Sequence, residues 1–243
     1  MASATYHSPL AALGAATLAL ALGCTTPAAP AARTPAEAKP APVKRISVED
    51  RGDLLEYRSL KREDFRASEP PPQADSRRGH VAAATCAYLV PDPKLRFRAV
   101  REGNATEFTS TADGLAFAAR MDPTCSWWDV QRTPFVDPSY VLEHEQIHFA
   151  IVELAARDLN RRAPEIAERL RASGPTSEVA LAATRAGFER EFAEAVQRTL
   201  ERSQAFDADT SLGLSREKQR EWLKQVEREL ADTTPRPQGS PAP

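Results

Sequence analysis

Residues 142–149 read Leu-Glu-His-Glu-Gln-Ile-His-Phe, the only cluster in the chain whose residue types indicate chemistry. His144 and His148 are four residues apart, which on an α-helix places them on one face, about 5–6 Å apart between Cβ atoms. Two imidazoles at that spacing can bind one zinc ion at about 2.0–2.1 Å. Glu145 lies about 100° round the helix from His144, so it can flank the metal without binding it. The stretch therefore supplies two ligands and a general base, but no third ligand.

The sequence on either side of this stretch predicts a helix. Asp137 can accept a hydrogen bond at the N-cap, and Pro138 suits the first helical position. An apolar stripe at helical spacing follows, formed by Val141, Leu142, Ile147, Ile151, Leu154, Ala155 and Leu159. We expect a buried or half-buried helix that ends near residues 160–163. The competing interpretation is a solvated helix face that carries charges, but buried histidines and a glutamate would be costly without a partner.

The first half of the chain has the patterns of strands and turns. Residues 80–90 are rich in β-branched and aromatic side chains, and residues 95–101 alternate apolar and charged ones. Two shorter strands are expected at 105–111 and 115–121, around the hairpin signal Asp113-Gly114.

The second half has the patterns of helices. Pro164 should open a short helix that ends at Gly174-Pro175, and Thr176 or Ser177 should cap a long helix that reaches about Ala205. Ser215 should cap a last helix. The expected core-facing positions are Phe188, Phe192, Val196, Leu200, Trp222, Leu223, Val226 and Leu230. Strands followed by helices predict an α+β fold, with a small antiparallel sheet in the N-terminal half and a helical C-terminal half that carries the motif helix.

The N-terminus has the features of a secretion signal. Residues 9–23 are apolar but too few to span a bilayer as a helix, which suits a signal peptide. Gly23-Cys24 resembles the end of a bacterial lipoprotein signal, whose cysteine becomes the lipidated mature N-terminus. We expect 1–23 to be a signal peptide of this type and the protein to be exported and anchored to a membrane, facing the periplasm or the cell exterior. The alternative is an N-terminus that is not cleaved.

Composition divides the remainder into a tether, a domain and a tail. Residues 24–43 are rich in Ala and Pro and cannot bury enough apolar surface to fold. Residues 44–232 are long enough for one domain with its own core, and the Pro-rich residues 233–243 are expected to be disordered. The net charge is −2 and the pI about 6.1, so no basic patch argues for a nucleic-acid partner.

Two cysteines, Cys86 and Cys125, remain once Cys24 is set aside. In an oxidising compartment an even pair favours a disulfide, and two buried free thiols are the alternative.

Helix geometry narrows the search for the third ligand. Glu153 is about 180° round the motif helix from His144, and Asp158 lies about 15 Å along the axis from His148. Neither can bind the same ion. The ligand must come from another segment, and the candidates are Asp207, Asp209, Glu189, Glu191, Glu194 and His80.

Four segments between about residues 54 and 230 carry a family resemblance. They are residues 60–65, 82–85, 142–149, and 204–213 with Gln219 and Trp222. They resemble L-x-W-x-D-F, A-A-x-T, L-x-H-E-Q-x-H-F and Y-D-x-x-T-x-H-G…Q-x-x-W of the predicted secreted zinc-dependent proteases of bacteria. Three positions differ from that pattern: Arg62 replaces Trp, Phe206 replaces Tyr and Leu212 replaces His.

The resemblance implies a zinc-dependent peptide hydrolase of the cell envelope that acts on a peptide or protein substrate. It favours Asp207 as the third ligand beside His144 and His148, with Glu145 as the catalytic base. A glutamate from residues 177–205 is the second choice. Two other functions remain open: a metal-binding but non-catalytic envelope interaction domain, and a peptidoglycan amidase.

Overall fold

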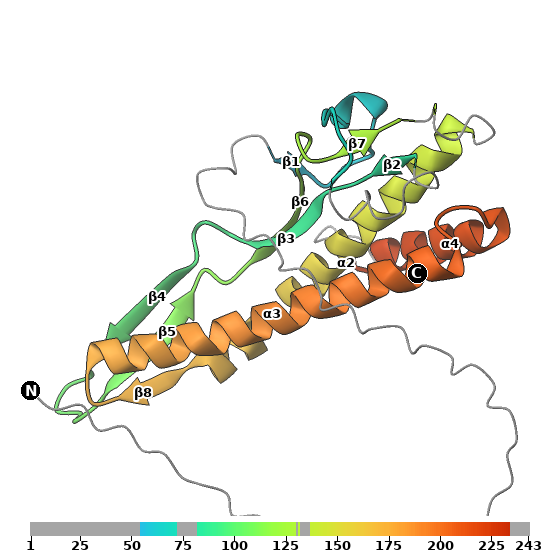
Figure 1. Cartoon of the computed structure of the whole chain (residues 1–243). Coiled ribbons are helices and arrows are strands. Elements are labelled where there is room, and N and C mark those ends of the chain that lie inside the picture. The colour runs from blue at the N-terminus through green and yellow to red at the C-terminus, as the bar shows by residue number, and fades with distance from the viewer. Residues whose placement is uncertain (1–53, 72–81, 130, 132–136, 234–243) are drawn as a thin grey trace, which may run out of the picture. The chain divides into compact units, whose positions relative to one another are not determined.

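The computed structural model describes residues 54–71, 82–129, 131 and 137–233, all within the unit that spans Ile46–Pro243. All but one of the strands precede the α-helices, and the two longest helices run side by side along the strands (Figure 1). The α+β prediction is confirmed. In the described part of the chain, no helix is both long enough and apolar enough to cross a membrane.

The strands form three small antiparallel sheets rather than one. Their orders are β1-β6-β3, β2-β7 and β4-β5-β8. The strands are β1 (Leu55–Glu56), β2 (Ala83–Ala84), β3 (Ala87–Pro91), β4 (Arg96–Val100), β5 (Phe108–Asp113), β6 (Phe117–Met121), β7 (Trp127–Trp128) and β8 (Ala172–Gly174).

The expected strand at 80–90 is divided between β2 and β3. The division falls at Thr85-Cys86, where Cys86 is bonded to Cys125 and its N–H donates to Ser126 Oγ at 3.0 Å. These contacts turn the backbone away from a continuous ladder. His80 and Val81 lie outside the described residues.

The hairpin predicted at Asp113-Gly114 is wrong, because β5 and β6 do not pair with each other. Instead β3 pairs with β6 and β4 with β5, so that the four strands form one long bent hairpin. At the bend, residues 92–95 lie opposite 114–116, one residue fewer, as in a β-bulge. Gly114 has φ +69°, and a Cβ there would lie 3.0 Å from the Lys94 carbonyl oxygen. Gly114 therefore lies at a bend within the long hairpin and not at the turn that closes it.

Helix α2 (Pro138–Leu170) carries the histidine motif and starts as predicted. Asp137 Oδ1 accepts hydrogen bonds from Ser139 N at 2.9 Å and from Ser139 Oγ at 2.8 Å. The predicted end near 160–163 and the separate short helix after it are wrong, because α2 continues through Pro164. A proline inside a helix removes one backbone hydrogen bond, but Ile166 and Leu170 beyond it are buried in the core and hold the helix together.

Two further helices complete the domain. Helix α3 (Ser177–Asp209) begins at the predicted cap, where Thr176 Oγ1 accepts from Val179 N at 3.3 Å, and it ends four residues later than expected. Helix α4 (Arg216–Thr233) begins after Ser215 as predicted. Leu200 is 37% exposed and does not belong to the core. The other predicted core positions of α3 and α4 do pack against buried side chains.

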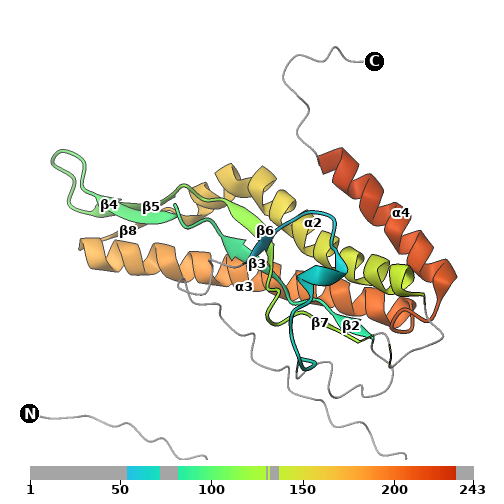
Figure 2. The same ribbon diagram turned by 90° about the horizontal axis from the view of Figure 1, so that it is seen from above.

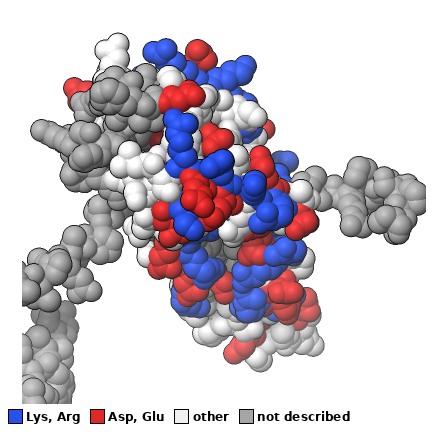
Figure 3. Space-filling model, turned by 90° about the vertical axis from the view of Figure 1, so that its right-hand side faces the viewer, with Lys and Arg blue, Asp and Glu red and all other residues white. Residues whose placement is uncertain are grey.

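Two apolar clusters meet on α2. One side of the helix packs with the bent ribbon and α3 around Phe149 and Met121, both 0% exposed. The other packs with the C-terminal part of α3 and with α4 around Ile147 and Phe206. Seen from above in Figure 2, β4, β5 and β8 lie beside the N-terminal half of α3, whereas α4 lies beside α2 at the other end. Figure 3 shows one face of the surface, on which Lys and Arg side chains intermingle with Asp and Glu.

Candidate metal centre

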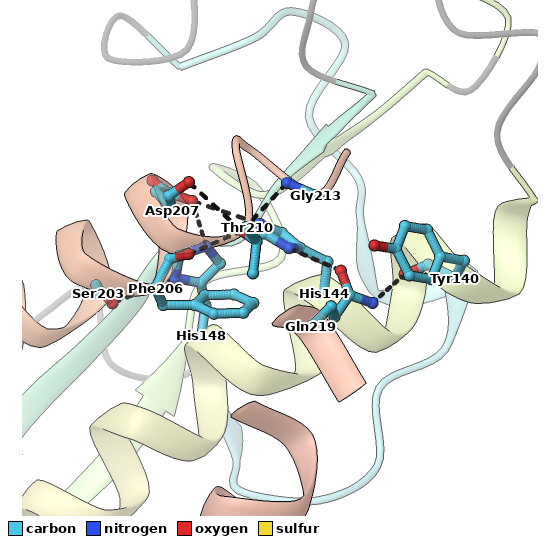
Figure 4. Close-up of polar contacts among 9 residues, drawn as sticks. All are labelled: Tyr140, His144, His148, Ser203, Phe206, Asp207, Thr210, Gly213 and Gln219. Atoms are coloured by element: carbon cyan, nitrogen blue, oxygen red, sulfur yellow. Dashed lines mark hydrogen bonds and ion pairs between the residues drawn. The ribbon is translucent and has the colours of Figure 1, made fainter. Parts of the chain in front are cut away.

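His144 and His148 lie one turn apart on α2, and the last turn of α3 brings Asp207 between them (Figure 4). Asp207 Oδ1 is 3.1 Å from His148 Nε2 and 3.4 Å from His144 Nε2. One ligand atom from each of the three residues lies within 4.8 Å of the others. Among the described residues, this is the one group of three or more His, Cys, Asp or Glu side chains that could hold a metal ion.

The far nitrogen of each imidazole also has a partner. His144 Nδ1 is 3.1 Å from Gln219 Oε1, and His148 Nδ1 is 3.2 Å from Ser203 Oγ. An amide oxygen can only accept a hydrogen bond, so this contact requires a proton on His144 Nδ1. Its Nε2 is thereby directed at Asp207. Hydrogen bonds of this kind orient histidine ligands in metal sites.

Phe206 forms an aromatic wall beside both histidines. Its ring is 0% exposed, with its centroid 4.4 Å from that of His144 and 4.9 Å from that of His148. The Trp222 ring packs against it at 5.4 Å. Phe206 therefore restricts rotation of the imidazoles and shields the site from water on that side.

The loop between α3 and α4 closes over His144. Ser211, Leu212 and Gly213 have consecutive positive φ values of 51°, 59° and 81°. A Cβ at Gly213 would lie 3.3 Å from His144 Nδ1. Buried Thr210 ties the loop together, since its Oγ1 donates to the Phe206 carbonyl oxygen at 2.7 Å and accepts from Gly213 N at 3.2 Å. Non-glycine residues in this conformation are uncommon and cluster at functional sites.

The Asp207 carboxyl is held in its charged form. Burial alone raises its pKa, but the contacts with the His144 and His148 side chains favour the charged carboxylate, outweigh burial and keep the pKa well below its ordinary value. The centre thus combines a carboxylate with two imidazoles, and this donor set suits zinc.

Glu145 lies next to His144 on α2 but is not a member of the three-residue group. Its side chain belongs to a residue that is only 4% exposed. Within the described part of the chain, no hydrogen bond or ion pair to its carboxylate is found. Its carboxylate oxygens keep contact with solvent, since they are not among the fully buried polar atoms that lack a partner.

The other candidate ligands lie elsewhere. Asp209 accepts a hydrogen bond from Trp222 Nε1 at 3.1 Å, Glu191 pairs with Arg169 at 3.2 Å and Glu194 pairs with Arg198 at 3.8 Å. Glu189 is exposed and His80 lies outside the described residues. Of the described candidates, only Asp207 joins the histidines.

A hollow of about 410 Å³ lies between α2, α3 and α4, with an apolar floor that includes Ile151 and Leu154. None of the three cluster residues lines it, so it is separate from the centre.

The predicted Cys86–Cys125 disulfide is present. It joins the junction of β2 and β3 to the segment just before β7, across a sequence separation of 39 residues. Such a bond is consistent with an exported protein. Cys24 lies outside the described residues.

Sequence reasoning missed the roles of Ser203 and Gln219. Gln219 was part of the resemblance, which marked its position without a role, whereas nothing in the sequence marked Ser203. No family model, curated protein or solved structure matches the chain. The resemblance to zinc-dependent proteases therefore stays a prediction.

Proposed function

We propose that this protein is a zinc-dependent hydrolase that cleaves peptide bonds in the bacterial cell envelope. The observation that carries the proposal is the convergence of His144 Nε2 and His148 Nε2 on one oxygen of Asp207. Three ligands of this kind with one open position are the arrangement of catalytic zinc sites, whereas structural sites have four protein ligands.

The roles of the residues follow from their chemistry. His144, His148 and Asp207 would hold the ion, which when bound supplies a Lewis acid that acidifies water and polarises a carbonyl group. Glu145 accepts the proton of the attacking water and passes it to the leaving amine. Its burial next to a ligand, with no donor among the described residues, supports this role, because a proton acceptor must be free of competing hydrogen bonds.

The sequence of the N-terminus and the disulfide support the proposed place of action. Residues 1–23 are proposed to direct export, and Cys24 to carry a lipid that anchors the chain to a membrane. Replacing Cys24 with Ala should move the protein from the detergent phase to the aqueous phase. Equal partitioning of both forms would contradict the anchor.

A second candidate function is a metal-stabilised domain without catalysis. It is favoured by the low exposure of the ligand side chains, which is 11% for His144, 18% for His148 and 21% for Asp207. An ion held there would also cross-link α2 to α3. A peptidoglycan amidase is a third candidate, since the same centre can attack an amide bond in either polymer.

The Glu145→Gln variant and activity assays on two substrates together distinguish these functions. The variant should bind zinc as the wild type does, because the residue is not a ligand, but should lose hydrolysis, because an amide cannot accept the proton. Metal content is measured by elemental analysis, and activity against both a peptide library and purified peptidoglycan. Cleavage of peptides alone supports the protease, and release of stem peptides alone supports the amidase. A wild type that binds zinc but cleaves neither substrate supports the interaction domain.

A further inference from the structure

Gln219 lies at the base of the metal centre with every polar atom of its amide engaged. The residue is 0% exposed, although it comes from α4, a helix that supplies no ligand. Its Oε1 faces His144 Nδ1 at 3.1 Å, while its Nε2 donates to the Tyr140 carbonyl oxygen at 3.0 Å and to Glu143 Oε1 at 2.9 Å. Figure 4 shows the amide between the imidazole of His144 and the backbone of Tyr140.

These partners fix which way the amide points. The two groups that face Nε2 are both acceptors, so the NH₂ end must lie there and the oxygen must face His144. That oxygen in turn favours the tautomer of His144 with its proton on Nδ1, which leaves Nε2 as the metal-facing nitrogen. A carboxylate could accept the imidazole proton but could not donate to Glu143, and an apolar side chain could do neither.

We propose that Gln219 is a positioning residue of the metal centre, which holds His144 in the one tautomer and ring orientation that presents Nε2 to an ion. The proposal rests on the metal-binding part of the proposed function and adds that α4 helps to form the centre. It also assigns the first turns of α2 a role, since Tyr140 and Glu143 are the groups that hold the amide in place.

The alternative is that Gln219 only fills space in the core between α2 and α4. The two roles predict opposite orders of zinc affinity for two variants. Gln219→Met keeps the size of the side chain and suits an apolar core, but it removes the acceptor for His144. Gln219→Glu keeps that acceptor but buries a charge beside Glu143. A space-filling role makes the glutamate variant the worse of the two, and a positioning role makes the methionine variant the worse.

The first measurement is zinc affinity, by competition with a coloured chelator. Gln219→Met should bind zinc about 10–100-fold more weakly than the wild type, as loss of a hydrogen bond that orients a histidine ligand does elsewhere. Gln219→Glu should stay within about tenfold of the wild type. The matched control is Gln225→Met, the same change on the same helix at an exposed residue that bonds only Glu229 among the described residues. It should leave affinity unchanged.

The second measurement needs no metal. Two-dimensional ¹⁵N spectra of the histidine rings at alkaline pH report the tautomer, and the chain has only 4 histidines to assign. The wild type and Gln219→Glu should show a larger share of the Nδ1-protonated form of His144 than Gln219→Met, because Gln219→Met removes the acceptor at Nδ1 while Asp207 stays at Nε2. Circular dichroism of the metal-free variants checks that they fold. If Gln219→Met does not fold, Gln219→Glu alone decides, because it must keep the Nδ1 proton.

The results separate this inference from the function it rests on. A wild type that binds no zinc overturns the proposed function, while the tautomer measurement still decides the role of Gln219. A wild type that binds zinc, together with a Gln219→Met variant that keeps both the affinity and the Nδ1 proton, overturns the positioning role alone.

Discussion

Phe206 lies almost face to face with His144, with ring centroids 4.4 Å apart and planes inclined by 29°. The contact makes one aromatic side chain part of both the second core cluster and the candidate metal centre. A change at this position should therefore alter the free energy of unfolding and the zinc affinity together.

Phe206→Ala tests that coupling. Removing a fully buried phenylalanine should lower the free energy of unfolding by about 3–5 kcal/mol. It should also weaken zinc binding, because both imidazoles lose the ring that packs against them. Denaturant unfolding and chelator competition measure the two effects. Phe117→Ala is the control, since Phe117 is also buried but lies in β6. It should destabilise without changing zinc affinity, and an equal loss of affinity in both variants would contradict the coupling.

Gly213 and Gly103 form a matched pair for the loop over His144. Both have positive φ, 81° and 52°, so replacing either with Ala should cost about 1–2 kcal/mol of stability from the backbone alone. A Cβ at Gly103 meets nothing within 4 Å, whereas one at Gly213 meets His144. Only Gly213→Ala should weaken zinc binding. Identical zinc titrations for the two variants would show that the loop does not constrain the imidazole.

Asp207 and Asp209 lie two residues apart and provide the test of the third ligand. Asp207→Asn should abolish stoichiometric zinc, because a neutral amide replaces the charged donor and two ligands hold zinc weakly. Asp209→Asn changes a carboxylate that bonds Trp222 and should leave zinc in place. Elemental analysis of both purified variants decides. Full occupancy in Asp207→Asn would remove Asp207 from the ligand set.

Asp64 should make stability depend on pH at the acidic end. Asp64 lies in the short 3-10 helix η2 (Arg62–Asp64), where it bonds Arg58 at 2.6 and 2.8 Å and Lys61 N at 2.7 Å. Burial raises its pKa, but the hydrogen bonds from Arg58 and Lys61 outweigh burial and lower it. A lowered folded pKa stabilises the protein fully above the unfolded value of about 3.9, and this contribution is lost as pH falls through the folded value.

The wild type should exceed Asp64→Asn by about 1–2 kcal/mol in free energy of unfolding at pH 7, a modest figure because Arg58 is partly exposed. The difference should shrink as pH falls below about 4. Urea unfolding at a series of pH values measures it, and a difference that stays constant down to pH 2 would refute the ionic origin.

Much of the fold could be predicted from local signals. The caps at Asp137 and Thr176 are chemical features of single residues, and the structure confirms both. The predictions at Pro164 and Gly114 are wrong because contacts distant in the sequence decide the structure there. Their local preferences for a helix start and a hairpin turn are overridden by the burial of Ile166 and Leu170 and by the pairing of β3 with β6.

In the candidate site, too, the residues that depend on local spacing could be predicted and those that depend on helix packing could not. The spacing of His144 and His148 in the sequence was sufficient to place them together, because one helix carries both. Asp207 is 59 residues from His148, so only resemblance could favour it over the other carboxylates. Ser203 and Gln219 were beyond prediction, because their partners are set by how α3 and α4 pack on α2.

The wide separation of the ligands also fixes when the centre can form during synthesis. The ribosome delivers His144, Glu145 and His148 first, and 59 residues separate His148 from Asp207. At about 5–20 residues per second, that interval lasts roughly 3–12 s. Throughout it the emerging chain has Glu145 and two imidazoles but no complete set of candidate ligands. The centre is assembled only when the last two helices have appeared, so a chain that stalls before Asp207 carries the motif without its third ligand.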